Sequence, residues 1–397
     1  MNWPLVELGE VIDFIRGVTF KPGDLVENFS NASIVVMRTK NVQVAGLKVD
    51  DLISIPKNLV RREEQILKNG DMLISSANSW ALVGKVSLIN DLNYECTAGG
   101  FISIVRPISR VVDSQYLYHW ISAPKNQDAI RHCGRQTTNI SNLDVGRFKT
   151  LKIPLPPLAE QKRIADILDK ADGMRRKRQQ AIDLADEFLR ATFLDMFGDP
   201  FNNIMGFPKM RLDSFGSVFT GNTPPRSEKK YYGDYIDWIK SNNIHESSLY
   251  VSRAKEFLST EGAAIGRRVP SGSILVTCIA GSRDSIGNTA LTDRPVAFNQ
   301  QINALVPTDP NKTLFIYQQL NLHKELVRER SIGVTTGQVN KTTFSSIELL
   351  DPPEELVVDF TRRISQLNML FHQFKDSTRG INECFNSLQH KAFAGEL

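Results

Sequence analysis

The chain has few cysteines and no long apolar run. Its cysteines stand far apart among 397 residues, at Cys96, Cys133, Cys278 and Cys384. No CxxC pair or nearby set of histidines accompanies them, which argues against a disulfide framework and a zinc site. No apolar stretch reaches the roughly 18 residues of a membrane span, and the N-terminus lacks the basic and then apolar layout of a signal peptide. These features predict a cytoplasmic protein with reduced thiols.

Motifs of cofactor-dependent and hydrolytic enzymes are also missing. The stretch GNTPPR lacks the P-loop lysine, AGSRDSIG lacks the GxGxxG spacing, and no HExxH occurs. The stretch DPPE, Asp351 to Glu354, resembles the (D/N)PP(F/Y) motif of amino-methyltransferases, but glutamate replaces the aromatic residue that stacks on the flipped base. It also matches LPPL in the other half of the chain, which favours a helix start. We expect no catalytic residue, no cofactor and no metal in this chain, so a self-sufficient methyltransferase or nuclease is the least favoured alternative.

The composition is that of a globular protein with sizeable cores. Apolar residues make up 41% and charged residues 23%. At 397 residues the chain exceeds one ordinary domain, so two or more folded units are expected. A net charge of +4 is compatible with a polyanionic partner but does not require one.

The two halves of the chain repeat each other. Placing Trp3 on Phe207 aligns WPLVEL with FPKMRL, and VMRTKNV then aligns with WIKSNNI after a short shift. NGDMLIS falls on SGSILVT, LVGKV falls on SIGNT, and GRQTTNISNL pairs loosely with GVTTGQVNKT. Short apolar runs predict strands, and residues 115–130 and 314–330 predict helices. Each copy is therefore expected to have a mixed α/β fold.

A long helix is predicted after each copy. PLPPLAEQKRIADIL and LLDPPEELVVDFTRRI share an abrupt Pro-Pro joint, where proline suits the first helical turn. Apolar positions follow with the four-three spacing of a coiled coil, and each position in the second helix lies 196 residues after its counterpart. The predicted seam residues are Ile164, Leu168, Ile182, Leu189, Phe360, Ile364, Leu367, Phe371, Phe374, Phe385 and Leu388.

The direction of pairing follows from size and charge. Parallel helices would place Arg175 and Arg178 against aromatic residues, whereas antiparallel helices pair Ala171 with Phe385. The expected fold is thus an α/β (mixed α+β) tandem repeat, with two similar globular domains separated by a two-helix antiparallel coiled coil. The predicted domains are residues 1–155, the central helix at 156–197, residues 198–350, and the distal helix at 351–397.

Polar loops at matching places in the two copies predict contact with DNA. They are rich in the residues that pair with base edges and phosphates. The DNA-binding candidates of the first copy are Arg38, Lys40, Asn41, Asn78, Lys85, Arg135, Gln136, Thr137 and Asn139. Those of the second copy are Lys240, Asn242, Asn243, Arg283, Asn288, Gln300, Thr335, Thr336, Gln338 and Lys341. Any one of these loops could instead be merely solvated.

The joint, the helix after it, and the segments FLRATFLDMFGDP and LQHKAFAGEL together resemble the specificity subunit of type I restriction–modification systems. The resemblance covers essentially the whole chain. It implies two target-recognition domains that read a split DNA target, with a spacer set by the coiled coil. It also implies two modification subunits that use S-adenosylmethionine to methylate adenine, and two restriction subunits that use ATP and Mg to move along DNA and cut it.

Docking of these partners is expected on the outward faces of the helices. The candidates are Glu160, Gln161, Arg163 and Asp166, whose alternative role is a plain solvated helix face. The second copy has Leu356 and Val357 where the first has Glu160 and Gln161, so the two helix starts need not bind partners equally. A coiled-coil adapter with protein-binding ends remains the main alternative to a DNA reader.

Overall fold

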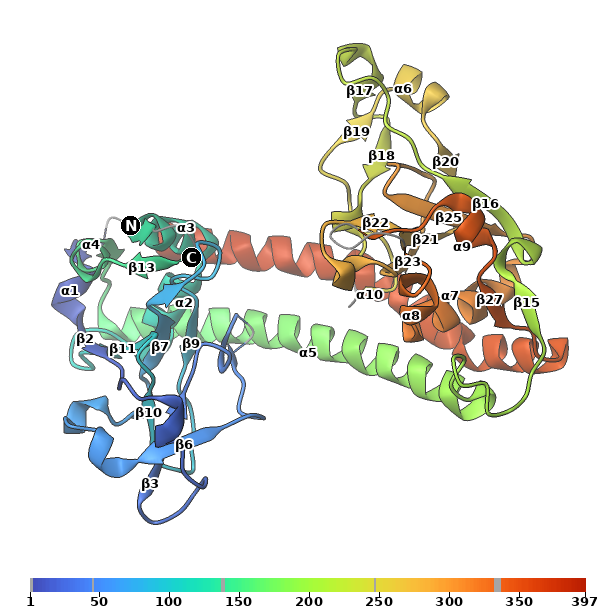
Figure 1. Ribbon diagram of the computed structural model, residues 1–397. Coiled ribbons are helices and arrows are strands. Elements are labelled where there is room, and N and C mark those ends of the chain that lie inside the picture. Colours follow the sequence, from blue (N-terminus) through green and yellow to red (C-terminus); the bar gives the residue numbers. More distant parts are fainter. Residues whose placement is uncertain (1–2, 45, 137–139, 246–247, 332–336) are drawn as a thin grey trace. The chain divides into compact units, whose positions relative to one another are not determined.

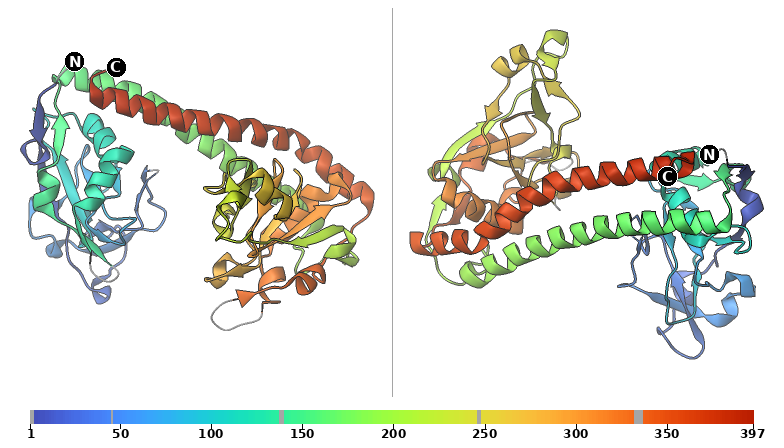
Figure 2. Two further views of the ribbon diagram at one scale, coloured as in Figure 1. Left: turned by 90° about the horizontal axis from the view of Figure 1, so that it is seen from above. Right: turned by 180° about the vertical axis from the view of Figure 1, so that it is seen from behind.

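The fold is described from a computed structural model. It describes residues 3–44, 46–136, 140–245, 248–331 and 337–397, without the side chains of Gln136 and of residues 365–379. The chain forms two compact units. Unit 1 comprises Met1–Gln179 and Asp376–Leu397, and unit 2 comprises Gln180–Lys375. Each unit therefore contains one copy of the repeat and half of each long helix, and both termini belong to unit 1 (Figure 2).

Unit 1 is built on a four-stranded antiparallel sheet in the order β2-β11-β7-β9. Its strands are Ile12–Arg16, Ile102–Pro107, Met72–Ser75 and Val86–Leu88. A second sheet, β10-β3-β6, uses Cys96–Ala98, Ser33–Met37 and Ile53–Pro56, and its β10–β3 pair is parallel. A third, β12-β13-β8, uses Gly134–Gln136, Ser141–Leu143 and Ala77–Asn78. Strands β4 (Val42–Gln43) and β5 (Gly46–Leu47) form a small hairpin.

Unit 2 repeats this plan with its own strands. The four-stranded sheet β16-β25-β21-β23 uses Gly216–Thr220, Ile302–Pro307, Ile274–Thr277 and Thr289–Leu291. A five-stranded sheet, β17-β19-β18-β24-β20, uses Tyr232–Gly233, Phe257–Leu258, Ile236–Ile239, Val296–Phe298 and Arg268–Val269. Strands β22 (Ile279–Ala280) and β26 (Gly337–Gln338) pair with each other. Gly84 and Gly287 share a positive φ, of 82° and 85°, at equivalent turns, so the predicted tandem repeat is confirmed.

Short helices lie against these sheets (Figure 1). Unit 1 has α1 (Leu8–Val11), α2 (Ser114–Ser122), α3 (Pro124–His132) and α4 (Val145–Lys149). Unit 2 has α6 (Thr260–Ile265), α7 (Thr313–Leu322), α8 (Glu325–Arg328) and α9 (Lys341–Ser345). The prediction of one continuous helix over 115–130 is wrong, because Pro124 starts a new helix after the extended residue Ala123. The helix predicted over 314–330 likewise breaks, at His323.

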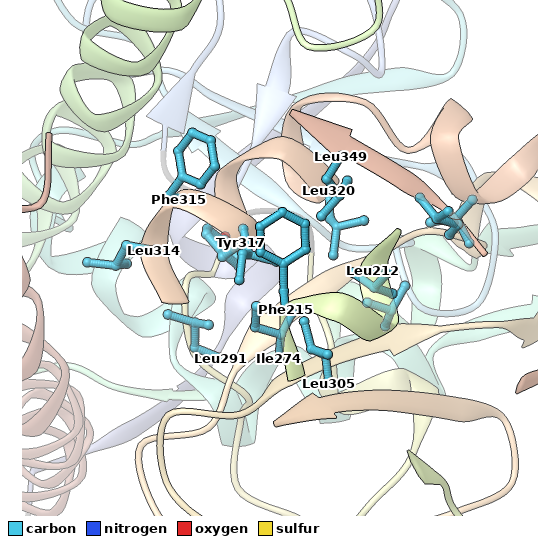
Figure 3. Close-up of a cluster of buried hydrophobic side chains, with 14 of the residues drawn as sticks. Leu212, Phe215, Ile274, Leu291, Leu305, Leu314, Phe315, Tyr317, Leu320 and Leu349 are labelled. Atoms are coloured by element: carbon cyan, nitrogen blue, oxygen red, sulfur yellow. The ribbon is translucent and has the colours of Figure 1, made fainter. Parts of the chain in front are cut away.

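The main core of unit 2 lies between α7 and the four-stranded sheet. Figure 3 shows Tyr317 of α7 on the side of the helix that faces Ile274 of the sheet, whereas Phe315 lies on its other side, and all three belong to one buried cluster. The same cluster includes side chains of both long helices. Both long helices therefore pack into the hydrophobic core of the globular copy in unit 2.

The long helices are α5 (Leu158–Phe197) and α10 (Glu354–Ala394). Each begins directly after a Pro-Pro pair, and the carbonyl of Pro157 or Pro353 accepts from a backbone amide of the first turn. Gly198 and Gly395, with φ of 69° and 78°, follow the last helical residues and end the helices, because glycine adopts this left-handed conformation without strain. The forty residues of α5 correspond to about 60 Å of helix.

Each joint follows a two-stranded sheet, β1 (Leu5–Glu7) with β14 (Lys152–Pro154) in unit 1, and β15 (Lys209–Arg211) with β27 (Glu348–Leu350) in unit 2. In unit 1 the Tyr116 hydroxyl donates to the Pro154 carbonyl at 2.8 Å. In unit 2 the Gln319 amide instead accepts from Leu350 N at 2.7 Å and donates to Leu350 O at 3.3 Å. The two copies therefore hold the same joint with different side chains.

The helices pair antiparallel within each unit, as predicted. In unit 1, Arg163 donates to Leu397 O at 3.0 Å, and the Arg175 guanidinium lies 5.1 Å from the Phe385 ring centre. In unit 2, Phe193 and Phe197 contact Phe360. The helix-to-domain contacts are equivalent too: Phe393 meets Tyr116 in unit 1, and Phe197, which lies 196 residues earlier, meets Phe315 in unit 2.

Most of the seam residues that the structure describes are buried. Five are less than 5% exposed: Ile164, Leu168, Leu189, Phe360 and Ile364. Phe385 is also buried, and Ile182 and Leu388 are partly buried against the cores. Full burial of each large side chain contributes roughly 1.5–3 kcal/mol, so these residues stabilise the cores that the long helices share with each globular copy. The side chains of Leu367, Phe371 and Phe374 lie outside the described part.

Candidate DNA-recognition surfaces

Equivalent strand pairs carry several of the predicted DNA-binding residues. In unit 1, Leu143 N donates to Ser76 O at 2.8 Å beside the β8–β13 pair. In unit 2, Val339 N donates to Cys278 O at 2.9 Å beside the β22–β26 pair. Asn142 in β13 and Gln338 in β26 each have an exposed side-chain amide. Each lies two residues before the N-cap of a short helix, Asp144 or Asn340. The two copies thus present the same backbone frame.

This frame corrects one predicted pairing and adds one candidate residue. The loose match of GRQTTNISNL with GVTTGQVNKT is wrong by three residues, because Gln338 corresponds to Asn142 and not to Asn139. Asn142 is exposed and was not predicted as a DNA-binding residue. The 196-residue offset between the two long helices also relates Asn142 to Gln338. Extending this offset to the residues before the Pro-Pro joint would have identified Asn142 from the sequence.

Asn41 and Asn243 are structural residues in both copies. The Asn41 side chain accepts from Arg38 N at 2.8 Å and donates to Lys48 O at 2.9 Å. The Asn243 side chain accepts from Lys240 N at 3.0 Å and donates to Arg253 O at 3.0 Å. Both are buried. Their amides close the loops after β3 and β18, so the predicted base contacts would require these hydrogen bonds to break.

The basic residues at the start of these loops are paired with acids. Arg38 donates to the Asp51 carbonyl at 2.9 Å and lies 3.3 Å from the Asp51 carboxylate, which Lys40 also approaches. Burial lowers the pKa of Arg38. Lys240 pairs with Glu256 and lies 4.8 Å from the Trp238 ring centre. Hydrogen bonds from Lys240 and Arg226 lower the pKa of the Glu256 carboxyl.

Lys85 and Asn288 occupy equivalent positions and hold neighbouring segments. Lys85 is 8% exposed, donates to Gln43 Oε1 at 3.2 Å, and has its pKa lowered by burial. Asn288 Oδ1 accepts from Lys324 Nζ at 2.7 Å. The Lys85 ammonium group is enclosed by the protein in this conformation, so the predicted DNA contact would require the side chain to move.

The other described candidates lie at the surface. Arg135 is 80% exposed although its guanidinium pairs with Asp144 at 2.7 Å. Asn78 is half-buried and donates to Ser75 Oγ at 3.1 Å. The exposed candidates of unit 2 are Asn242, Arg283, Gln300, Gln338 and Lys341. Thr137, Asn139, Thr335 and Thr336 lie outside the described residues, and Gln136 is described only as backbone in β12.

The predicted partner-docking residues divide into one buried and several exposed side chains. Gln161 is fully buried, so its placement on an outward face is wrong. Its amide accepts from Asp113 N at 2.8 Å and donates to Pro156 O at 2.8 Å and Val111 O at 3.2 Å. Arg163 and Asp166 are exposed, and Glu160 pairs with Arg163 at 2.8 Å. Hydrogen bonding to Arg163 lowers the pKa of Glu160.

Among the described residues, no group of three or more His, Cys, Asp or Glu side chains could hold a metal ion. Within the same ranges, no helix is long and apolar enough to cross a membrane.

Comparisons with known proteins agree with this architecture. The family model described as "Type I restriction modification DNA specificity domain" matches residues 1–183 and 206–359. The chain is 23% identical to the EcoKI specificity subunit of Escherichia coli K12 over 100% of this chain and 89% of the relative. It is 32% identical to the HindI specificity subunit of Haemophilus influenzae over 40% of this chain and 35% of the relative.

A solved structure shares the fold. The S subunit from M. genitalium superposes with a TM-score of 0.61 at 14% identity, covering 99% of this chain and 96% of the other. The family match spans most of the chain and falls once on each copy of the repeat. The chain therefore belongs to the type I restriction–modification DNA specificity family.

Proposed function

We propose that this chain is the DNA-reading subunit of a type I restriction–modification complex, in which each copy reads one half of a split target. The observation that carries the proposal is the repeat itself. Two equivalent frames present polar side chains at the same place, Asn142 in one copy and Gln338 in the other. Because half-site spacing follows protein geometry, two modules on helices of fixed length suit two half-sites at a fixed separation.

The chemistry belongs to partners in this proposal. Two modification subunits would bind S-adenosylmethionine and methylate adenine, and two restriction subunits would use ATP and Mg for translocation and cleavage in the cytoplasm. Exposed helix residues such as Arg163 and Asp166 are candidates for docking the modification subunits. The relatives are named as specificity subunits, which agrees with a role in recognition.

Enrichment from a pool of randomised DNA duplexes tests this function. The full-length chain should enrich one motif with two specified parts and an unspecified spacer. Its affinity for that duplex should fall steeply as salt rises, because phosphate contacts release counterions. A coiled-coil adapter would enrich no motif, and its binding to a protein partner would be much less sensitive to salt.

A further inference from the structure

Large apolar side chains gather at the surface around β8 in unit 1. Trp80 and Leu82 follow this strand in the turn that leads to β9, and Ile140 directly precedes its partner β13. The Phe101 carbonyl accepts from the amides of Ser76 at 3.0 Å and Ala77 at 3.3 Å, so this residue lies at the other end of β8. The exposed fractions are 63% for Phe101, 47% for Ile140, 43% for Leu82 and 37% for Trp80. Single exposed apolar residues are normal, but a group of them marks an interaction surface.

The turn that carries Trp80 and Leu82 is held in place. Leu82 N and Val83 N both donate to Ser79 O, at 3.0 and 2.9 Å. Helix α3 braces the turn from the side, because Gln127 donates to Gly84 O at 3.0 Å. The ring of His132, at the end of α3, lies 5.3 Å from the Trp80 ring in an edge-on contact. The apolar side chains are therefore presented on a fixed support.

Polar groups suited to DNA lie beside the apolar ones. Arg135 and Asn142 face each other across the β12–β13 pair, so their side chains share one side of the sheet. Both are exposed. A guanidinium and a carboxamide next to aromatic and aliphatic groups form a mixed surface that fits the edges and phosphates of a duplex.

The equivalent place in unit 2 has different chemistry. Gln301 occupies the position of Phe101, because its carbonyl accepts from Cys278 N at 2.8 Å and Ile279 N at 3.0 Å. The loop after β22 carries Arg283 at its exposed tip, and Arg328 fixes this loop by donating to the Asp284 carbonyl at 2.5 Å. Equivalent backbone positions around β8 and β22 thus carry apolar side chains in the first copy and hydrogen-bonding side chains in the second.

We propose that the first copy reads its half-site through apolar contacts of Trp80, Leu82, Phe101 and Ile140 with thymine C5-methyl groups, while the second copy reads its half-site by hydrogen bonds. The thymine methyl is the group in the major groove that such side chains recognise. This inference rests on the proposed function and adds the kind of recognition used by each copy. The ligand is double-stranded DNA with A·T pairs in the first half-site.

Deoxyuridine substitution tests the proposal, because it removes the methyl group and leaves base pairing intact. The probe is the duplex enriched by the full-length chain, with thymines replaced by deoxyuridine in one half-site at a time. Loss of one contacted methyl should weaken binding roughly three- to fivefold. The penalty should occur in one half-site only, and Trp80→Ala and Phe101→Ala should each reduce or abolish it.

Two further variants serve as matched controls. Arg283→Ala, in the equivalent loop of unit 2, should lower affinity but leave the uridine penalty unchanged. Leu25→Ala removes an exposed apolar side chain outside this group and should change neither. Because the changed side chains are exposed, circular dichroism should show all variants folded.

Several results would overturn the inference while leaving the proposed function intact. These are no uridine penalty, an equal penalty in both half-sites, or a first half-site without any A·T pair. An unchanged penalty in both Trp80→Ala and Phe101→Ala, together with lost binding of the modification subunit, would make the surface a protein-docking site instead. Failure to enrich any two-part duplex would remove the proposed function and this inference together.

Discussion

Gln161→Ala should destabilise the protein strongly, because the buried amide of Gln161 connects the start of α5 to the segment before α2. Its side chain is fully buried and takes part in three hydrogen bonds to backbone groups, those of Val111, Asp113 and Pro156. Alanine leaves these backbone groups without that partner. A buried polar group without a partner costs about 1–3 kcal/mol, so even the low end of this range gives a loss of about 3 kcal/mol.

Thermal unfolding of the full-length chain, followed by circular dichroism, measures this loss. For a unit of this size, each kcal/mol lowers the midpoint by roughly 2–4 °C, so a fall of roughly 6–12 °C is expected. Hydrogen exchange supplies a local measure, because the Asp113 amide that donates to Gln161 should lose protection in the variant.

The neighbouring residue Lys162 provides the control. It is exposed on the same turn of α5, so Lys162→Ala should change stability by no more than about 0.5 kcal/mol. Equal melting curves for Gln161→Ala and Lys162→Ala would refute the structural role. If Gln161→Ala then lost only the modification subunit, Gln161 would be a docking residue after all.

Three further predictions concern other side chains. Asn41→Ala and Asn243→Ala should each lower stability by about 1–3 kcal/mol in thermal melts, and base preference at no single position should change, because both amides bind their own loops. Asp166→Lys should leave the melting midpoint within about 2 °C of the parent and reduce co-purification of the modification subunit, because its carboxylate is exposed. Burial, and to a lesser extent repulsion from Asp183, raises the pKa of Asp186 to about 6. Between about pH 4 and 6 the Asp186 carboxyl is therefore protonated in the folded state but ionised in the unfolded state. Stability is therefore lost as pH rises through this window, and Asp186→Asn should stabilise by about 1–2 kcal/mol at pH 8 but much less near pH 4; an equal gain at both pH values would contradict the shift.

The long helices could be predicted from sequence because one simple period determines them. Apolar residues spaced by four and three define a seam, and antiparallel pairing of Ala171 with the region of Phe385 follows from size and charge. The Pro-Pro joints and Gly198 set the helix ends by local backbone chemistry. In contrast, the break at Ala123 was missed, although Pro124 is visible in the sequence, because the apolar spacing continues across it.

The binding residues were harder to predict because polar side chains serve two purposes. Asn41 and Lys85 have the chemistry of DNA contacts, yet their loops need internal hydrogen bonds and enclose them. Gln161 has the sequence context of a solvated helix, but its side chain is buried because it donates to the Val111 carbonyl and accepts from the Asp113 amide. The spacing of residues in the sequence does not show which backbone groups need a side-chain partner. This is visible only in the folded loops.

Methyl transfer from S-adenosylmethionine to DNA tests the central claim most directly. The chain would be assayed alone and with the modification subunit, and methylated adenines would be located by sequencing. The account predicts no transfer by the chain alone, and transfer by the mixture at one target with two specified parts. Transfer by the chain alone would contradict it, as would methylation by the mixture at a single uninterrupted site.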